Sequence, residues 1–195
     1  MAYATLPELR AYLNIAAANT DDDALLSAAL TRAQKSIDAW CGWSFEAVTA
    51  TRKYDPYADV DPRDRAVLHL DEPLLTLTAL TNGDATAITP AQYLLEPANT
   101  SPKWRVRIKA STGLYWTCDD EDHEQSISVA GTWGYSATAD GVIQQAALRL
   151  AAYMYRQRDA QVFDVTAQPA EGILMIPQGM PKDVTVMLAS YRRTH

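Results

Sequence analysis

The stretch Asp140–Gln161 reads DGVIQQAALRLAAYMYRQRDAQ and has the least ambiguous hydrophobic pattern in the chain. Its apolar residues recur at the i, i+3, i+4, i+7 spacing of an amphipathic helix, which predicts one buried face. Asp140 stands at the N-cap position, where a carboxylate accepts hydrogen bonds from free backbone N–H groups. The apolar positions are Val142, Ile143, Ala146, Ala147, Leu150, Tyr153 and Met154.

Three further helices are predicted on either side of this one. The sequence TLPE at Thr5–Glu8 has the form of a capping box, so a short helix should follow it. Thr20 and the three carboxylates of Asp21–Asp23 should open a second helix, and Gly42 should end it in the left-handed conformation. Pro181 should open the last helix. A metal site at Asp21–Asp23 is less favoured than helix capping, because no second ligand cluster is visible.

The region between Trp43 and Tyr135 changes its hydrophobic period from 3.6 toward 2 and is rich in turn residues. This pattern predicts short antiparallel strands. Asn82-Gly83 is the strongest local turn signal and predicts a type I′ turn, which needs positive φ at both central residues. The candidate strands are Thr49–Tyr54, Ala66–Leu70, Leu75–Thr81, Tyr93–Glu96, Trp104–Ile108 and Ser126–Trp133.

Two charged loops interrupt the β-rich region. Asp55–Arg65 (DPYADVDPRDR) mixes proline with alternating charge and is expected to be exposed. Asp119–Glu124 (DDEDHE) is an acidic run around His123, which is either a divalent-cation or acid/base site or a solvated hairpin tip. The tip is favoured, because consecutive acidic residues in a loop point in many directions.

Composition is that of an ordinary globular protein, with 48% hydrophobic and 21% charged residues. A net charge of −7 argues against a general electrostatic grip on nucleic acid, which requires clustered Lys and Arg. No apolar run reaches the roughly 18 residues of a membrane span, and no signal-peptide pattern is present. Cys41 and Cys118 lack a CxxC or a Cys/His partner and are expected to be free thiols.

The search for chemistry finds no phosphate loop, no GxSxG and no HExxH. His69 lies in a candidate strand and is expected to be a structural or exposed residue. No nucleophile, base and orienting group can be assembled into one site. We therefore expect no enzyme activity, no catalytic, cofactor-binding or metal residues, and no cofactor.

Residues 162–180 contain Pro169, Gly172, Pro177 and Gly179 and are too broken for one regular element. Within them lies an uncharged apolar island, which is either tucked onto the protein's own core or left for a partner. The arginines of the long helix are either partner contacts or simply a solvated face. The candidate assembly residues are therefore Ile173, Leu174, Met175, Ile176, Arg149, Arg156 and Arg158.

The order of the parts also carries a family resemblance. The segments concerned are Ile37–Phe45, Leu70–Leu75 with the Asn-Gly turn after it, Ser128–Tyr135, Leu150–Arg158 and Ser190–Arg193. As an ordered set, rather than as single motifs, they resemble the head–tail connector, or head-completion adaptor, proteins of long-tailed phages and prophages. The resemblance covers nearly the whole chain.

The resemblance implies an α+β fold: a small helical bundle with a β-rich antiparallel insertion between the second and third helices. One connector domain of residues 1–195 is expected. Its expected parts are N-terminal helices at 1–45, the insertion at 46–136, the central helix at 137–161, a loop or arm at 162–180 and a C-terminal helix at 181–195.

The function that the resemblance implies is structural. Such a protein forms a ring at the portal vertex, joins head to tail and continues the DNA channel. Its implied partners are other copies in a twelvefold ring, the portal protein and the next head-completion or tail protein; DNA passes without sequence-specific binding, and no membrane is involved. Its implied location is the head–tail interface of the virion, after synthesis in the host cytoplasm. Open alternatives are another ring component such as a tail-completion protein, a metal-dependent hydrolase using Asp119–Glu124, and a binding module of the bacterial host.

Overall fold

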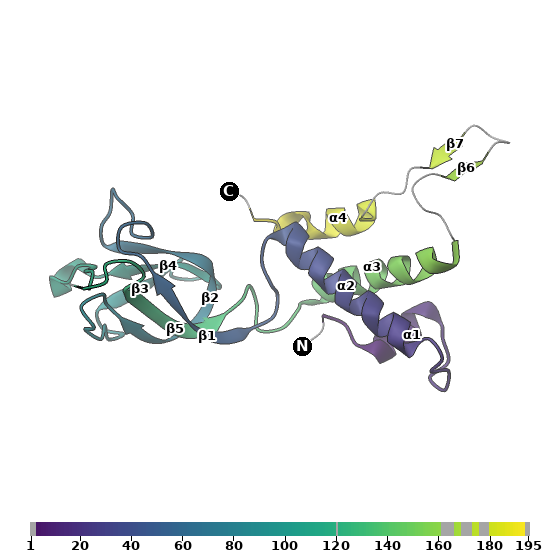
Figure 1. The fold of residues 1–195 in the computed structure, drawn as a ribbon, viewed down its shortest axis with the longest axis horizontal. Coiled ribbons are helices and arrows are strands. Elements are labelled where there is room, and N and C mark those ends of the chain that lie inside the picture. Colours follow the sequence, from purple (N-terminus) through teal and green to yellow (C-terminus); the bar gives the residue numbers. More distant parts are fainter. Residues whose placement is uncertain (1–2, 120, 161–165, 169–172, 176–179, 194–195) are drawn as a thin grey trace. The chain divides into compact units, whose positions relative to one another are not determined.

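The fold is known from a computed structural model, which describes residues 3–119, 121–160, 166–168, 173–175 and 180–193. Within these residues, four α-helices and a five-stranded antiparallel sheet make it an α+β protein, as predicted (Figure 1). The chain divides into two compact units. The helical unit comprises Met1–Trp43 and Ala139–His195, and the sheet unit comprises Ser44–Thr138.

The helical unit contains the four helices that the sequence predicts. They are α1 (Leu6–Leu13), α2 (Asp23–Cys41), α3 (Gly141–Ala160) and α4 (Lys182–Leu188), the last followed by a 3-10 turn at Ala189–Tyr191. The capping box before α1 is present: Thr5 accepts a hydrogen bond from Glu8 N, and the Glu8 carboxylate accepts one from Thr5 N. Asp140 accepts the backbone N–H groups of Val142 and Ile143 at 3.0 Å each. Gly42 ends α2 with φ 82°, as predicted.

The core of the helical unit is aliphatic. Helices α1, α2 and α4 all pack on α3, and small residues let the helices approach closely. The predicted buried face of α3 is confirmed at Ile143, Ala146, Ala147 and Leu150, whereas Tyr153 and Met154 are only partly buried and Val142 is 41% exposed. The fully buried side chains of this unit include Leu9, Leu26, Ala29, Ala33, Ile37, Ile143, Ala146, Leu150, Ala151 and Leu188.

The start of α2 differs from the prediction of three capping carboxylates. The helix begins at Asp23, and the side chain of Asp22 at the N-cap position makes no capping hydrogen bond. Asp22 instead accepts a hydrogen bond from the Tyr155 hydroxyl on α3 at 2.5 Å. Asp23 pairs with Arg10, whose Nε lies 2.9 Å from the carboxylate. Two of the predicted capping carboxylates therefore bond to side chains of neighbouring helices and do not cap α2.

The sheet unit is built from five strands in the order β1-β5-β2-β4-β3. They are β1 (Val48–Tyr54), β2 (Val67–Thr81), β3 (Tyr93–Glu96), β4 (Lys103–Ile108) and β5 (Ile127–Trp133), with a 3-10 turn at Ala110–Thr112. All neighbouring strands are antiparallel. In β4, Val106 and Ile108 are buried whereas Arg105 is exposed, which is the alternation of a strand with one dry face.

The prediction of two separate strands at Ala66–Leu70 and Leu75–Thr81 is wrong. The structure has one strand, β2, which pairs with β4 through Val67–His69 and with β5 from Leu74 onward. The register shifts between His69 and Leu74, where Pro73 lies. Proline is tolerated in a strand at such an irregularity, because no ladder hydrogen bond requires its missing N–H there.

The predicted type I′ turn at Asn82-Gly83 is also wrong. Neither residue has positive φ; Ala85 does, with φ 60°. Asn82 is buried, and its side chain donates to Tyr115 O at 2.9 Å and accepts from Thr117 N at 3.1 Å. A Cβ on Gly83 would lie 2.1 Å from Thr117 O. Asn82 therefore supplies a buried amide that bonds to the backbone of Tyr115 and Thr117, and Gly83 allows that backbone to approach closely.

The segment 162–180, predicted as a loop or arm, contains two short strands in its described parts. Strands β6 (Thr166–Gln168) and β7 (Ile173–Met175) pair antiparallel, with Ala167 opposite Leu174. Periodicity cannot identify strands of three residues. Across the residues that the structure describes, no helix has the length and apolar character needed to span a bilayer.

Candidate assembly surfaces

The helical unit has a hollow of about 240 Å³ at the surface formed by α1, α3 and the start of α4. Arg149 and Arg156 both line it, because a separation of seven residues places two side chains on one face of a helix. Arg149 pairs with Asp183 of α4 at 2.9 Å. Both partners are about two-fifths exposed, so the pair contributes little to stability and stays accessible to a partner. The other lining residues are Tyr12, Ala152, Tyr153, Pro181 and Val184.

The helical unit also exposes several apolar side chains, of which Tyr12 lines this hollow. Val186 on α4 is 68% exposed, although it lies between the buried residues Val184 and Leu188. Tyr12 and Val142 are each 41% exposed. Because it is two residues from each of the buried Val184 and Leu188, Val186 lies on the opposite face of α4 and presents an apolar side chain to solvent.

The predicted assembly residues are only partly described. Arg149 and Arg156 come together at the hollow. Ile173, Leu174 and Met175 form β7, Ile176 lies outside the described residues, and the side chain of Arg158 is not described. Their role as partner contacts stays a prediction.

Hydrogen bonds between helices hold the frame of this surface. Gln144 on α3 donates to Glu8 on α1 at 2.7 Å. Backbone and side-chain hydrogen bonds from Thr5 lower the pKa of Glu8, so this carboxylate is ionised at neutral pH. Tyr191 donates to Asp140 at 2.5 Å and so joins the C-terminal turn to the N-cap of α3. These bonds fix α1, α3 and the C-terminal turn as one platform.

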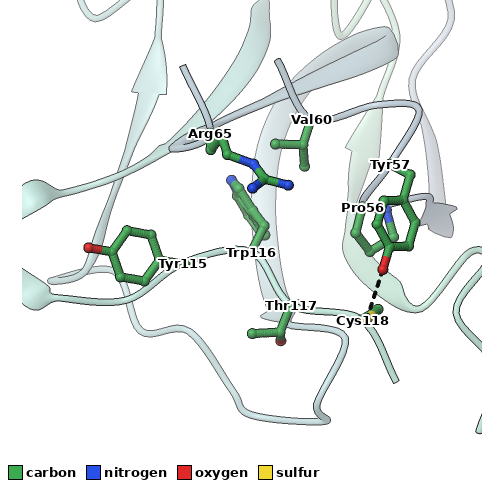
Figure 2. Close-up of a pocket in the computed structure, with 8 residues that line it drawn as sticks. All are labelled: Pro56, Tyr57, Val60, Arg65, Tyr115, Trp116, Thr117 and Cys118. Carbon is green, nitrogen blue, oxygen red and sulfur yellow. Dashed lines mark hydrogen bonds between the residues drawn. The ribbon is translucent and has the colours of Figure 1, made fainter. Parts of the chain in front are cut away.

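The sheet unit has a second hollow, of about 420 Å³, between two loops (Figure 2). One wall comes from the loop between β1 and β2, and the other from the segment before β5. Tyr57 and Tyr115 are 68% and 70% exposed, and the half-buried Trp116 lies between them in the view of Figure 2. The lining residues are Pro56, Tyr57, Val60, Arg65, Tyr115, Trp116, Thr117 and Cys118.

Hydrogen bonds position the walls of this second hollow. Trp116 donates its indole N–H to Ala66 O at 3.0 Å, and the buried Asn82 side chain holds the backbone on both sides of Trp116. The Tyr57 hydroxyl lies 3.6 Å from Cys118 Sγ, which joins the two walls. This contact and the charge of Cys118 raise the pKa of Tyr57.

Sequence reasoning missed this second hollow. It described Asp55–Arg65 only as an exposed loop and assigned no role to Tyr115–Cys118. The available signal was the aromatic content of two loops without strand periodicity, since Tyr57, Tyr115 and Trp116 have no partner pattern that would bury them. Which aromatic residues come together across 58 positions is a property of the fold.

Other predicted candidates are placed as follows. His69 is exposed on β2 and lies 3.2 Å from Asp61. Glu121, Asp122, His123 and Glu124 are all exposed. Throughout the part of the chain that the structure describes, no group of three or more His, Cys, Asp or Glu residues is arranged to hold a metal ion.

Cys41 and Cys118 are free cysteines, as predicted, and burial raises the pKa of Cys41 to about 11.

Taken together, the fold and the two hollows described above define a small α+β protein with surfaces suited to protein contacts. The chain belongs to the head completion protein family, whose model matches residues 3–194. This confirms the resemblance drawn from the ordered segments. No curated protein matches the chain significantly in sequence.

Two solved structures contain chains of similar fold. One is a chain from the neck of an empty gene transfer agent (GTA) particle, computed with C6 symmetry, with 16% identity and a TM-score of 0.56. The other is from the virion of a native GTA particle, with 18% identity and a TM-score of 0.60. Each match covers 99% of this chain and 91% of the other chain. The likeness therefore extends over both units.

Proposed function

We propose that this protein is a structural component of a phage or phage-like virion, where it forms a ring at the portal vertex, joins head to tail and continues the DNA channel. Membership of the head completion family over residues 3–194 is the observation that carries the proposal. The similar folds in a GTA neck and a GTA virion support it. Sixfold symmetry in the neck is compatible with the twelve subunits that match a portal.

The distribution of charge suits a channel that lets DNA pass. The sheet unit contains 14 acidic and 8 basic residues, whereas the helical unit contains 10 acidic and 9 basic residues. Neither unit has the excess of Lys and Arg that holds the phosphate backbone. DNA therefore slides past the ring without being trapped, and no sequence-specific reading is required.

The ring contact is heterologous, so a patch on one subunit meets a different patch on the next. The hollow with Arg149 and Arg156, together with the exposed Val186, is one of these patches. The apolar island Ile173–Ile176 and Arg158 are further candidate contacts, with the next subunit or with the portal protein. The two units act in this as one connector domain, which docks the next head-completion or tail protein at the head–tail interface after synthesis in the host cytoplasm.

The test is the molar mass by light scattering over a wide concentration range, with the same samples imaged by negative-stain microscopy. Closed rings of uniform size are expected, alone or after addition of the portal protein as a template. The double variant Arg149→Glu, Arg156→Glu should abolish rings without unfolding the subunit, since both side chains are accessible. Arg32→Glu, also on an exposed helical position, is the matched control and should leave the rings intact.

Partner choice separates the proposal from a tail-completion role. Purified portal protein should retain the chain in co-sedimentation, and purified tail-tube protein should not. Retention by the tail-tube protein alone would assign the chain to tail completion. Failure to form rings with the portal protein present, or retention by neither protein, would overturn the connector proposal.

A further inference from the structure

The hollow of the sheet unit has the composition of a peptide-binding groove. Its walls carry two exposed tyrosines, a half-buried tryptophan and Pro56 around the buried floor residue Val60. Tyrosine and tryptophan supply large apolar faces and lose little conformational entropy on binding, so they are enriched where binding energy is concentrated. A volume of about 420 Å³ accommodates a few residues of an extended chain and lies within the usual range of binding pockets.

Arg65 gives the hollow one positive charge that no described carboxylate pairs with. Figure 2 shows its guanidinium beside Trp116, directed into the space between the two loops. In the described part of the chain Arg65 has no ion-pair partner, whereas Arg52 and Arg107 each contact two carboxylates. An arginine fork that remains free in an aromatic setting is suited to a carboxylate from another molecule.

The nearby aspartates do not fill this role, because each has a partner elsewhere. Asp55 accepts a hydrogen bond from Tyr57 N at 2.7 Å, and Asp59 accepts one from Asp55 N at 2.8 Å. Asp64 pairs with Arg107 at 2.6 Å, and this contact is the largest of those that lower the pKa of its carboxyl group. The loop carboxylates are therefore tied to their own loop or to β4.

The hollow is held in place before any ligand arrives. Trp116 is fixed by its bond to Ala66 O, and the following residue is fixed by the buried Asn82 amide. Gly83 approaches Thr117 O so closely that no larger residue fits. A groove that is already formed does not lose binding energy to ordering of its walls.

We propose that this hollow binds an extended, proline-containing peptide segment of a partner protein, with one carboxylate of that segment facing Arg65. Proline-rich chains dock in aromatic-lined grooves because their extended helix is preformed and loses little entropy. One carboxylate rather than several is required, because the sheet unit's excess of six acidic residues would repel a strongly acidic chain. This inference concerns the sheet unit and does not depend on ring formation.

The test is fluorescence anisotropy with the full chain and a fluorescein-labelled peptide of sequence Pro-Pro-Glu-Pro-Pro, at low salt. Two matched peptides carry Gln or Lys in place of Glu. The Glu peptide should bind about tenfold more tightly than the Gln peptide, as expected for a charge-assisted pair. The Lys peptide should be weaker still. Binding of the Glu peptide should weaken at higher salt, because the Arg65 side chain is exposed.

Variants of the protein assign the binding to this hollow. Arg65→Gln should remove the preference for Glu over Gln, and Tyr115→Ala should weaken both peptides at least about threefold. Arg63→Gln changes an exposed arginine of the same loop that does not line the hollow, and it should leave binding unchanged. All three side chains are exposed, so the variants should melt at the wild-type temperature.

Three results would overturn the proposal: no binding by any peptide up to millimolar concentration, equal binding of the Glu and Gln peptides, or a preference for the Lys peptide. Single-stranded oligothymidine that competes with the Glu peptide in the wild-type protein but not in Arg65→Gln would also overturn it, because the hollow would then be a nucleic-acid site.

Discussion

The helical and sheet units are stabilised by different sets of side chains. The helical unit has a core of leucine, isoleucine and alanine, and its long-range polar contacts include tyrosine hydroxyls on aspartates, as in Tyr155–Asp22 and Tyr191–Asp140, beside the pairs Arg10–Asp23 and Arg149–Asp183. The core of the sheet unit is also mainly aliphatic, but it includes the buried aromatic residues Phe45, Tyr54 and Trp133. Arginine–carboxylate groups such as Arg52–Asp71 lie at its surface. The sheet unit therefore adds a dependence on a few large aromatic residues to the aliphatic packing that both units share.

Trp133 shows this dependence most clearly. Its side chain is 1% exposed, its indole N–H donates to Ala50 O at 2.9 Å, and the Arg52 guanidinium lies 4.9 Å from its ring centre. Arg52 in turn contacts Asp71 and Glu72. One residue therefore joins β5 to β1 and supports the ion group that connects β1 to β2.

The largest predicted effect is that of Trp133→Ala. It should destabilise the sheet unit by about 3–5 kcal/mol, because it removes a large buried side chain and leaves a cavity. The matched change in the helical unit is Leu150→Ala, at a fully buried position of α3, with an expected cost of about 2–5 kcal/mol. Urea unfolding gives the loss of stability, and hydrogen exchange by mass spectrometry locates it.

The location of the change is what tests the comparison. Trp133→Ala should raise exchange in β1–β5, and Leu150→Ala should raise it in the helices. Equal loss of protection in both units from either variant would show that the two units unfold together. The proposal that each unit is stabilised independently would then be wrong.

A second prediction concerns the glycines. Gly83→Ala places a Cβ 2.1 Å from Thr117 O and 2.7 Å from Ser126 Oγ, so the backbone must shift at a cost of about 1–3 kcal/mol. Gly141→Ala, at the start of α3, meets nothing within 4 Å and should be neutral or stabilising by up to about 1 kcal/mol. Thermal melts of both variants measure the contrast. A Gly83→Ala protein with the wild-type melting temperature would show that the hollow's wall tolerates movement.

The two units also differ in how much of them the sequence could predict. Helix periodicity and caps placed α1 to α4 closely, because each signal lies within one turn of the residue it governs. In the sheet unit the strands were located, but β2 was divided at Pro73 and the Asn82-Gly83 turn was assigned the wrong geometry. Both errors occur where the local structure depends on a segment that is distant in the sequence. For β2 these segments are β4 and β5, and for the Asn82-Gly83 turn the segment is Tyr115–Thr117.

The candidate surfaces follow the same rule. Arg149 and Arg156 share a helix face, so their common location could be predicted from spacing alone. Their neighbours Tyr12 and Val184 come from α1 and α4, and no spacing rule links them. The aromatic hollow joins two loops of the sheet unit, so it could be found only after strand pairing was known.

Asp140 tests whether the helical unit depends on its caps. Asp140→Ala removes two backbone N–H hydrogen bonds at the start of α3 and the bond from Tyr191, and should cost about 0.5–2 kcal/mol. Asp140→Asn retains a capping oxygen and should cost less. Chemical denaturation of the two variants gives the order. An alanine variant as stable as the wild type would show that packing on α3 outweighs capping.

The smallest predicted effect concerns Asp38 on α2. Burial raises the pKa of its carboxyl group, and the opposing effects of the Tyr3 hydroxyl that donates to it and of the Lys35 charge are smaller. The folded protein therefore binds this proton more tightly than the unfolded chain does. Stability falls as the pH rises from the ordinary aspartate pKa, about 3.9, through the raised folded pKa, and the ionised group is fully unfavourable above that value.

Asp38→Asn removes this unfavourable charge and keeps an oxygen that accepts the Tyr3 hydroxyl. The variant should be more stable than the wild type at neutral pH, by under about 1 kcal/mol because the group is only half-buried. The gain should shrink as the pH falls and vanish below about pH 3.9, where the wild-type carboxyl group is protonated in both states. Urea denaturation at a series of pH values, followed through the helical signal in circular dichroism, measures it. A variant less stable than the wild type at neutral pH would show that the Tyr3–Asp38 hydrogen bond stabilises the protein by more than burial of the charge destabilises it. The ionised carboxylates of the helical unit would then contribute to stability, as those paired with arginine in the sheet unit are expected to do.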